Sequence, residues 1–299
     1  MYDSPLLECL TPFFVEALED STESPEAVVA ALADRIYRVC HCREPLRTRA
    51  LGRDRARERE YVNALSGANG GTGPWHTAWI ARGVEGDGRV EVESGGLRLW
   101  ADPDDVRGTV TVGGEVRVHF PNEYRNISPG YYVVLGNADT GEHAGQIRLY
   151  WNLVPSVGPL IVERISACLN VADIGFRLKL LKDPSHASRT DAGVLYLPFS
   201  HLERALPLLR EVYHEVRDHL HPPVSAFVHR VAAGLGLAED MTDGTSFGVH
   251  RSQLLAHIVI AARGHAAPQA RTVALLHAAG HDPDRFFVNA GSAREYPTW

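Results

Sequence analysis

Lysine is nearly absent from this chain of 299 residues. Of its 30 basic residues, 28 are arginine, and the two lysines are Lys179 and Lys182. Arginine can replace lysine where only a positive charge is needed, but a guanidinium does not release its proton in a protein. Lys179 is therefore a candidate general base, although two lysines without a function would give the same count. Lys182 directly precedes Asp183, and we expect it to be solvated.

Cysteine is also scarce. The four cysteines, Cys9, Cys40, Cys42 and Cys168, are too few and too scattered for a disulfide framework. Cys40 and Cys42 flank His41, but no second ligand pair follows at the spacing of a zinc site. Motifs such as HExxH and GxGxxG are missing as well. We therefore expect no metal and no cofactor.

Long apolar runs are missing, and none approaches the roughly 20 residues that cross a bilayer. The N-terminal residues lack the basic region of a signal peptide. The net charge of -7 argues against a nucleic-acid surface. These absences predict a cytoplasmic protein that binds neither nucleic acid nor membranes.

The order of predicted elements indicates an α+β fold. Residues 4–64 have helical spacing, and short alternating segments with glycine turns over residues 75–120 indicate strands. Strands and helices then mix, which differs from a regular βαβ order. We expect a helical N-terminal subdomain with a small β region at residues 1–115 and a mixed α+β domain at residues 116–299. The later strands are predicted near residues 131–135, 146–153, 174–181 and 193–197, and the later helices near residues 159–169, 199–220, 249–263 and 268–279.

Ionisable side chains gather on the predicted strands of the second half. Strand alternation puts Arg148, Tyr150 and Asn152 on one face of their strand. On the strand at residues 174–181, alternation separates Arg177 and Lys179 from the apolar residues Phe176, Leu178 and Leu180. Each residue alone could also be an ordinary surface or salt-bridged side chain.

Further candidates lie in loops and at a helix start. Arg189 and Asp191 precede the strand that carries Tyr196, and Ser246 is a predicted N-cap for a helix that contains His250 and Arg251. An anion at this helix start would meet oriented backbone amides and Arg251.

Several segments resemble the Hop type-A effector family, which includes the lyase components of class V lanthipeptide and thioamitide biosynthesis. They are GQIRLYWNL, LNVADIGFRLKLLKDP, SRTDAGVLYLPF, GLGLAED, SFGVHR and AAGHDPDRFFVNAGS. The resemblance extends over roughly residues 115–299. The resemblance implies a phosphoserine/phosphothreonine lyase that forms dehydroalanine or dehydrobutyrine in a ribosomally made precursor peptide. A separate kinase, a partner in a complex, would phosphorylate the peptide first, and residues 1–115 would contact this kinase or the leader peptide.

A more distant similarity is to the phosphothreonine lyase effectors. Their order of Lys-x-His, catalytic lysine, arginine, tyrosine and arginine corresponds to Arg148 with Tyr150, then Lys179, Arg189, Tyr196 and Arg251. This chain has a tyrosine at the position where those enzymes have a histidine as the general acid. Tyr150, His250 and His119 therefore stay open as the general acid.

The residues suit β-elimination, which needs a base, an acid and cations for the departing phosphate. Lys179 would be the base if burial and nearby arginines lower its pKa. Arg148, Arg189, Arg251, Asn152, Tyr196, Arg177 and Asp191 are the predicted phosphate-binding or substrate-binding residues. The alternative is a non-catalytic protein that binds phosphopeptide or activates the kinase.

Overall fold

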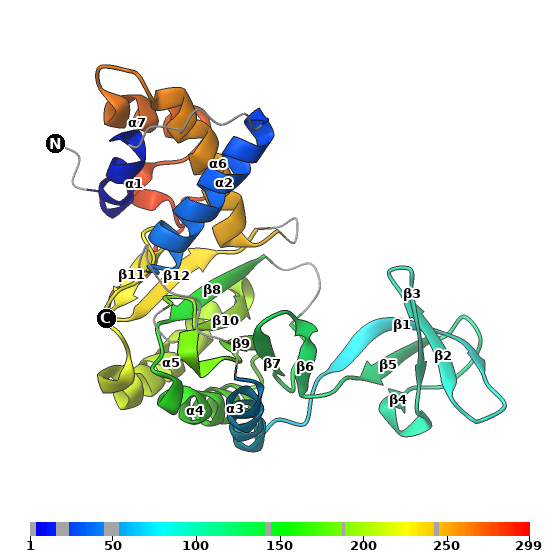
Figure 1. Ribbon diagram of the computed structural model, residues 1–299. Helices are drawn as coiled ribbons and strands as arrows, with labels where there is room; N and C mark the ends of the chain where they lie inside the picture. Colours follow the sequence, from blue (N-terminus) through cyan, green and yellow to red (C-terminus); the bar gives the residue numbers. More distant parts are fainter. Residues whose placement is uncertain (1–3, 16–23, 45–53, 141–144, 187–188, 242–244) are drawn as a thin grey trace.

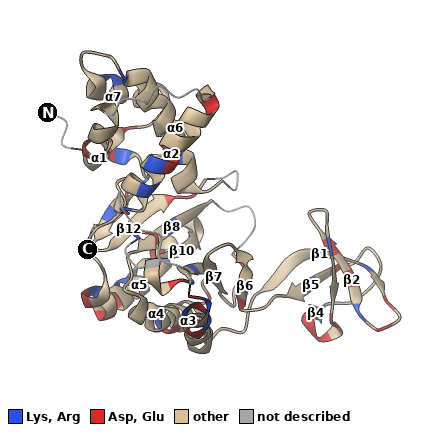
Figure 2. Ribbon diagram, viewed as in Figure 1, with Lys and Arg blue, Asp and Glu red and all other residues tan. Residues whose placement is uncertain are grey.

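The computed structural model describes residues 4–15, 24–44, 54–140, 145–186, 189–241 and 245–299 (Figure 1). This part of the chain contains seven α-helices and two antiparallel sheets, so the predicted α+β class is confirmed. No helix in it is long and apolar enough to cross a bilayer. Basic and acidic residues are interspersed over the helices and the smaller sheet (Figure 2).

The larger sheet has seven strands in the order β11-β12-β8-β10-β9-β7-β6. One face is apolar, because every second residue of the central strands, such as Leu149, Leu178 and Leu195, is fully buried. Helices α3, α4 and α5 cover this face (Figure 1). The bounds are β6 Glu123–Ser128, β7 Tyr131–Leu135, β8 Gln146–Trp151, β9 Arg177–Leu181, β10 Gly193–Pro198, β11 His229–Ala232, β12 Leu235–Glu239, α3 Arg55–Ala68, α4 Gly158–Val171 and α5 Leu202–Val216.

Helices from both ends of the chain pack together against part of the opposite face. Helices α1 (Pro5–Val15) and α2 (Pro25–Ile36) contact α6 (Phe247–Ala262) and α7 (Pro268–Ala278) (Figure 1). Their shared core includes Tyr150 of the sheet. A π-helical turn, Tyr37–His41, continues α2 toward the sheet.

The smaller sheet projects from the body of the molecule (Figure 1). It has its own apolar cluster, in which Trp79, Val92 and Val116 are buried. Its strands lie in the order β3-β2-β1-β5-β4, with bounds β1 Trp75–Val84, β2 Val90–Ser94, β3 Leu97–Ala101, β4 Val106–Arg107 and β5 Glu115–His119.

Two chain segments join the smaller sheet to the body, and asparagine amides connect them. Asn122 Nδ2 donates to Gly71 O over 2.6 Å, and Asn137 Oδ1 accepts hydrogen bonds from the amides of Thr72 and Gly73 over 2.7 and 3.2 Å. Gly73 has φ +97°, and a Cβ there would lie 2.0 Å from a carbonyl oxygen of residue 120. The glycine-rich segment is therefore a closely packed joint.

The predicted boundary at residue 115 coincides with the first residue of β5. Of the elements before it, α2 packs against α6, α3 packs against α4, and β1 to β4 belong to the smaller sheet. Whether residues 1–115 and 116–299 are separate units stays a prediction. The strands β6, β11 and β12 were not predicted.

Candidate active site

A cavity of about 440 Å³ lies on the larger sheet, on the face opposite α4 and α5. Its floor comes from β8, β9 and β10, and its walls come from the β6–β7 turn, the π-helical turn and the start of α6. The lining residues are Tyr37, His41, Ser128, Pro129, Tyr131, Arg148, Tyr150, Arg177, Lys179, Asp191, Val194, Tyr196, Asp240 and Ser246.

Strand register arranges the floor in two rows. Lys179 pairs with Val194, which pairs with Tyr150 on the far side. The next row runs from Arg177 through Tyr196 to Arg148 in the same way. Paired residues point to the same face, and adjacent strands lie about 4.8 Å apart, so the Cα atoms of Lys179 and Tyr150 are separated by about 10 Å. A small group can therefore lie between their side chains.

The amine of Lys179 lies above an aromatic ring and near two guanidinium groups. Its Nζ is 5.3 Å from the ring centroid of Tyr196. Burial, followed by the positive charges of Arg177 and Arg148, lowers the pKa of Lys179 to about 8, as expected from the sequence. About a tenth of the amine is then uncharged at pH 7, against well under a thousandth for an ordinary lysine.

The two arginines of the floor differ in their partners. Arg148 forms an ion pair with Asp240, in which its Nε donates to Oδ1 over 2.6 Å. Arg177 Cζ is 4.3 Å from the ring centroid of Tyr196, and its buried Nε has no hydrogen-bond acceptor among the described residues. Within that part of the chain, neither Arg177 nor Lys179 forms an ion pair. The floor thus presents two cations without a carboxylate partner, as an anion site requires.

Asp191 organises one wall of the cavity. It accepts hydrogen bonds from Arg189 Nε and Nη2 over 2.8 and 2.7 Å, and from the hydroxyls of Tyr37 and Tyr131 over 3.3 and 3.1 Å. Burial opposes ionisation, but the hydrogen bonds and charge of Arg189 lower the pKa of Asp191. The Arg189 guanidinium is therefore held by a carboxylate and fixes the wall, and it does not line the cavity itself.

His41 lines the cavity and was considered in the sequence only as a metal ligand. Its ring is buried, with Nδ1 2.9 Å from Ser225 Oγ, and it meets the ring of Tyr150 edge-on at 5.3 Å. Burial lowers the pKa of His41 to about 4, so the imidazole is neutral near pH 7. His41 reaches the cavity because it lies on the π-helical turn. Sequence periodicity does not reveal the backbone hydrogen bonds that form such a turn, so this position could not be predicted.

Tyr150 presents a buried hydroxyl at the end of the Lys179 row. Its oxygen has no hydrogen-bond partner of ordinary geometry among the described residues, and burial raises the pKa of the phenol. The group therefore keeps its proton at neutral pH. Ser246, the residue that precedes α6, lies at the rim, so the positive end of the helix dipole also faces the cavity.

Besides Arg189, four predicted residues lie outside the cavity. Arg251 is 1% exposed and donates hydrogen bonds to His281 Nε2 and Val288 O over 2.8 and 2.7 Å, because its side of α6 packs against the C-terminal segment. Asn152 follows the last residue of β8 and donates to Pro223 O. The other two are His250, which lies in the first turn of α6, and His119 of β5, whose Nδ1 lies 3.0 Å from Asp105 Oδ1.

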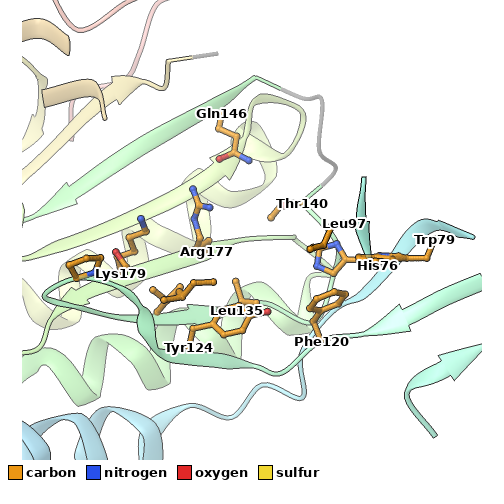
Figure 3. Close-up of a pocket in the computed structure, with 14 residues that line it drawn as sticks. His76, Trp79, Leu97, Phe120, Tyr124, Leu135, Thr140, Gln146, Arg177 and Lys179 are labelled. Atoms are coloured by element: carbon orange, nitrogen blue, oxygen red, sulfur yellow. The ribbon is translucent and has the colours of Figure 1, made fainter. Parts of the chain in front are cut away.

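A second cavity of about 500 Å³ adjoins the first and lies between the two sheets (Figure 3). Both cavities are lined by Ser128, Pro129, Arg177 and Lys179. Figure 3 shows Arg177 and Lys179 at one end of this space and His76, Trp79 and Phe120 at the other. The sequence pattern gave no indication of this second cavity.

Comparisons with known proteins agree with the architecture. The HopA1 effector protein family matches residues 123–288. The structure of an effector protein from Pseudomonas syringae pv. tomato strain DC3000 is similar, with a TM-score of 0.53, 14% identity, and coverage of 95% of this chain and 98% of that one. An effector protein from Pseudomonas syringae pv. syringae strain 61 gives a TM-score of 0.50, 15% identity and coverage of 90% and 99%. No curated protein matches the chain significantly.

Proposed function

The chain belongs to the HopA1 effector protein family, and we propose that it is a phosphoserine/phosphothreonine lyase acting on a phosphorylated peptide. The observation that carries this proposal is the pair of cations, Arg177 and Lys179, without carboxylate partners among the described residues. One of them is an amine whose pKa is lowered to about 8. A cavity with these properties offers both an anion site and a base.

In the proposed reaction the uncharged amine of Lys179 removes the Cα proton of the phosphorylated residue. The electron pair of the Cα–H bond becomes the second bond between Cα and Cβ, and the bond from Cβ to the bridging oxygen breaks. Tyr150 donates its proton to that oxygen, so that inorganic phosphate leaves. Solvent then carries the proton of Lys179 back to Tyr150. The peptide product contains dehydroalanine or dehydrobutyrine.

The phosphate would lie over the Tyr196 ring between Arg177 and Arg148. A planar guanidinium makes paired, charge-assisted hydrogen bonds with phosphate oxygens. Arg148 forms an ion pair with Asp240, which fixes its orientation. Arg177 would supply a positive charge that no carboxylate among the described residues neutralises. The start of α6 at the cavity rim adds a favourable dipole for the dianion.

The substrate would be the precursor peptide of a lanthipeptide or thioamitide pathway, phosphorylated by a separate kinase. Residues 1–115 are our candidate for the contact with that kinase or with the leader peptide, which would raise the local concentration of phosphopeptide. Deleting them would also remove Tyr37 and His41 from the cavity. A cleaner test reverses charges on the exposed side of α2, for example Glu26→Lys, and measures co-purification with the kinase. Undiminished co-purification would count against a contact through α2.

The two lysines provide a matched test of the base. Lys179→Arg keeps the charge but removes the group that can release a proton, so we expect at least a 100-fold loss of elimination. Lys182 is buried, and not solvated as the sequence suggested, but it does not line the cavity, so Lys182→Arg should stay within about twofold of the unaltered protein. Mass spectrometry of a phosphothreonine peptide measures the loss of phosphoric acid. Equal activity in both variants would exclude Lys179 as the base.

A second function is favoured by Tyr150, which stands where the phosphothreonine lyase effectors have a histidine. In this alternative the cavity binds phosphopeptide without turning it over, or the protein activates the kinase. An unchanged peptide mass together with saturable binding identifies a binder. Dehydration of the peptide that persists with Lys179→Ala identifies an activator of the kinase.

A further inference from the structure

We propose that the cavity between the two sheets holds the apolar residues next to the phosphorylated residue of the peptide. We call it the intersheet groove and define it by His76, Trp79, Leu97, Phe120, Tyr124 and Ile127. The inference rests on the proposed function, because it assigns the substrate segment beside the same site.

The intersheet groove is continuous with the candidate active site. Lys179 and Arg177 line both cavities, together with Ser128 and Pro129 of the β6–β7 turn. A phosphorylated residue held at Lys179 carries peptide on both of its sides, and an extended peptide advances about 3.3 Å per residue. The next few residues on one side therefore reach the groove.

The chemistry of the groove selects apolar side chains. Aromatic and aliphatic groups supply most of its walls, and no acidic residue lines it in the described part of the chain. Ile127 is 68% exposed and Leu97 is 55% exposed, and they come from different sheets. Large apolar side chains gathered at an open cavity indicate a binding surface. A basic segment would find no carboxylate here.

The volume and the fixed walls favour a peptide segment over a folded partner. About 500 Å³ accommodates a few side chains and is typical of a small-ligand site. The asparagine-linked joint holds the smaller sheet against the body, and His76 Nδ1 lies 3.1 Å from Asp139 Oδ1 across the two parts. A groove with walls already in place binds without the entropic cost of ordering them.

The test uses fluorescent peptides that carry a phosphonate analogue of phosphoserine, in which a methylene replaces the bridging oxygen and elimination is impossible. Three peptides are compared, with Leu-Phe-Leu before the analogue, with Leu-Phe-Leu after it, or with Gly-Ser-Gly on both sides. We expect one apolar peptide to bind at least about tenfold more tightly than the Gly-Ser-Gly peptide. Ile127→Ser and Leu97→Ser should reduce this ratio to about twofold.

Val84→Ser and Val171→Ser are the matched controls, because these exposed apolar residues, 61% and 90% exposed, lie outside the groove. They should leave the ratio unchanged. Equal binding of all three peptides, with normal elimination from a phosphothreonine peptide, overturns the groove assignment and leaves the lyase proposal standing. If no phosphonate peptide binds and phosphopeptide mass is unchanged, the proposed function fails and the groove assignment fails with it.

Discussion

The amine at position 179 has two guanidinium neighbours on the same sheet, and its protonation controls the proposed reaction. Only the uncharged amine can accept the Cα proton, so kcat/KM should rise as the pH increases through about 8 and then level off. A pH–rate profile with a phosphothreonine peptide measures this rising limb of the curve and its midpoint. Arg177→Met removes one source of repulsion and should move the limb to higher pH. A limb near pH 6, or none, would contradict a lysine base.

The hydroxyl of Tyr150 is our choice of acid, because it lies at the end of the Lys179 row. Tyr150→Phe should lower kcat about 100-fold and change KM little. Tyr196→Phe is the control, since it keeps the ring that contacts Arg177 and Lys179, and it should retain most activity. Full activity of Tyr150→Phe, combined with loss in His41→Gln, would move the acid role to His41.

Strand alternation predicted part of the site. It grouped Arg148 with Tyr150 on one strand and Arg177 with Lys179 on another, because the period of two is a local property of a strand. Arg251 could not be placed in this way. Its helix start was recognised, but the side of α6 that faces the cavity is set by packing against α7 and the C-terminal segment.

At the level of elements, α6 can approach the π-helical turn closely because Gly248 has no side chain. A Cβ at Gly248 would lie 2.5 Å from a ring carbon of His41, so Gly248→Ala should lower the free energy of unfolding by about 1–3 kcal/mol. Gly67→Ala in α3 meets no atom within 4 Å and should be neutral or stabilising by up to about 1 kcal/mol. Urea unfolding compares the two variants. Equal effects would mean that this contact carries no strain.

The elements missed by sequence analysis share a weak local signal. The strands β11 and β12 contain alanine and glycine, as in the segment AAGLGLAE, and have little β-propensity. They form strands because β12 pairs with β8 along its whole length. The helices were predicted well because caps and periodicity are local, as at Ser24, which accepts a hydrogen bond from Ala27 N.

For the whole molecule, the buried histidine predicts sensitivity to acid. His41 has a pKa of about 4 in the folded state, below the usual value of about 6.5, so the unfolded state binds more protons between these values. The free energy of unfolding should therefore fall by about 3 kcal/mol as the pH drops from 6.5 to 4, and should change little from this group above pH 6.5. Urea unfolding at several pH values measures the slope. His41→Gln should flatten it, and an unaltered slope would place the titrating group elsewhere.

The walls of the cavity come from Tyr37 near one end of the chain and from Asp240 and Ser246 near the other. A ribosome makes the first of these long before the last, so a nascent chain has the lysine but not its enclosure. Under the proposed function, chains that lack α6 should therefore eliminate phosphate poorly, because one wall of the cavity is missing.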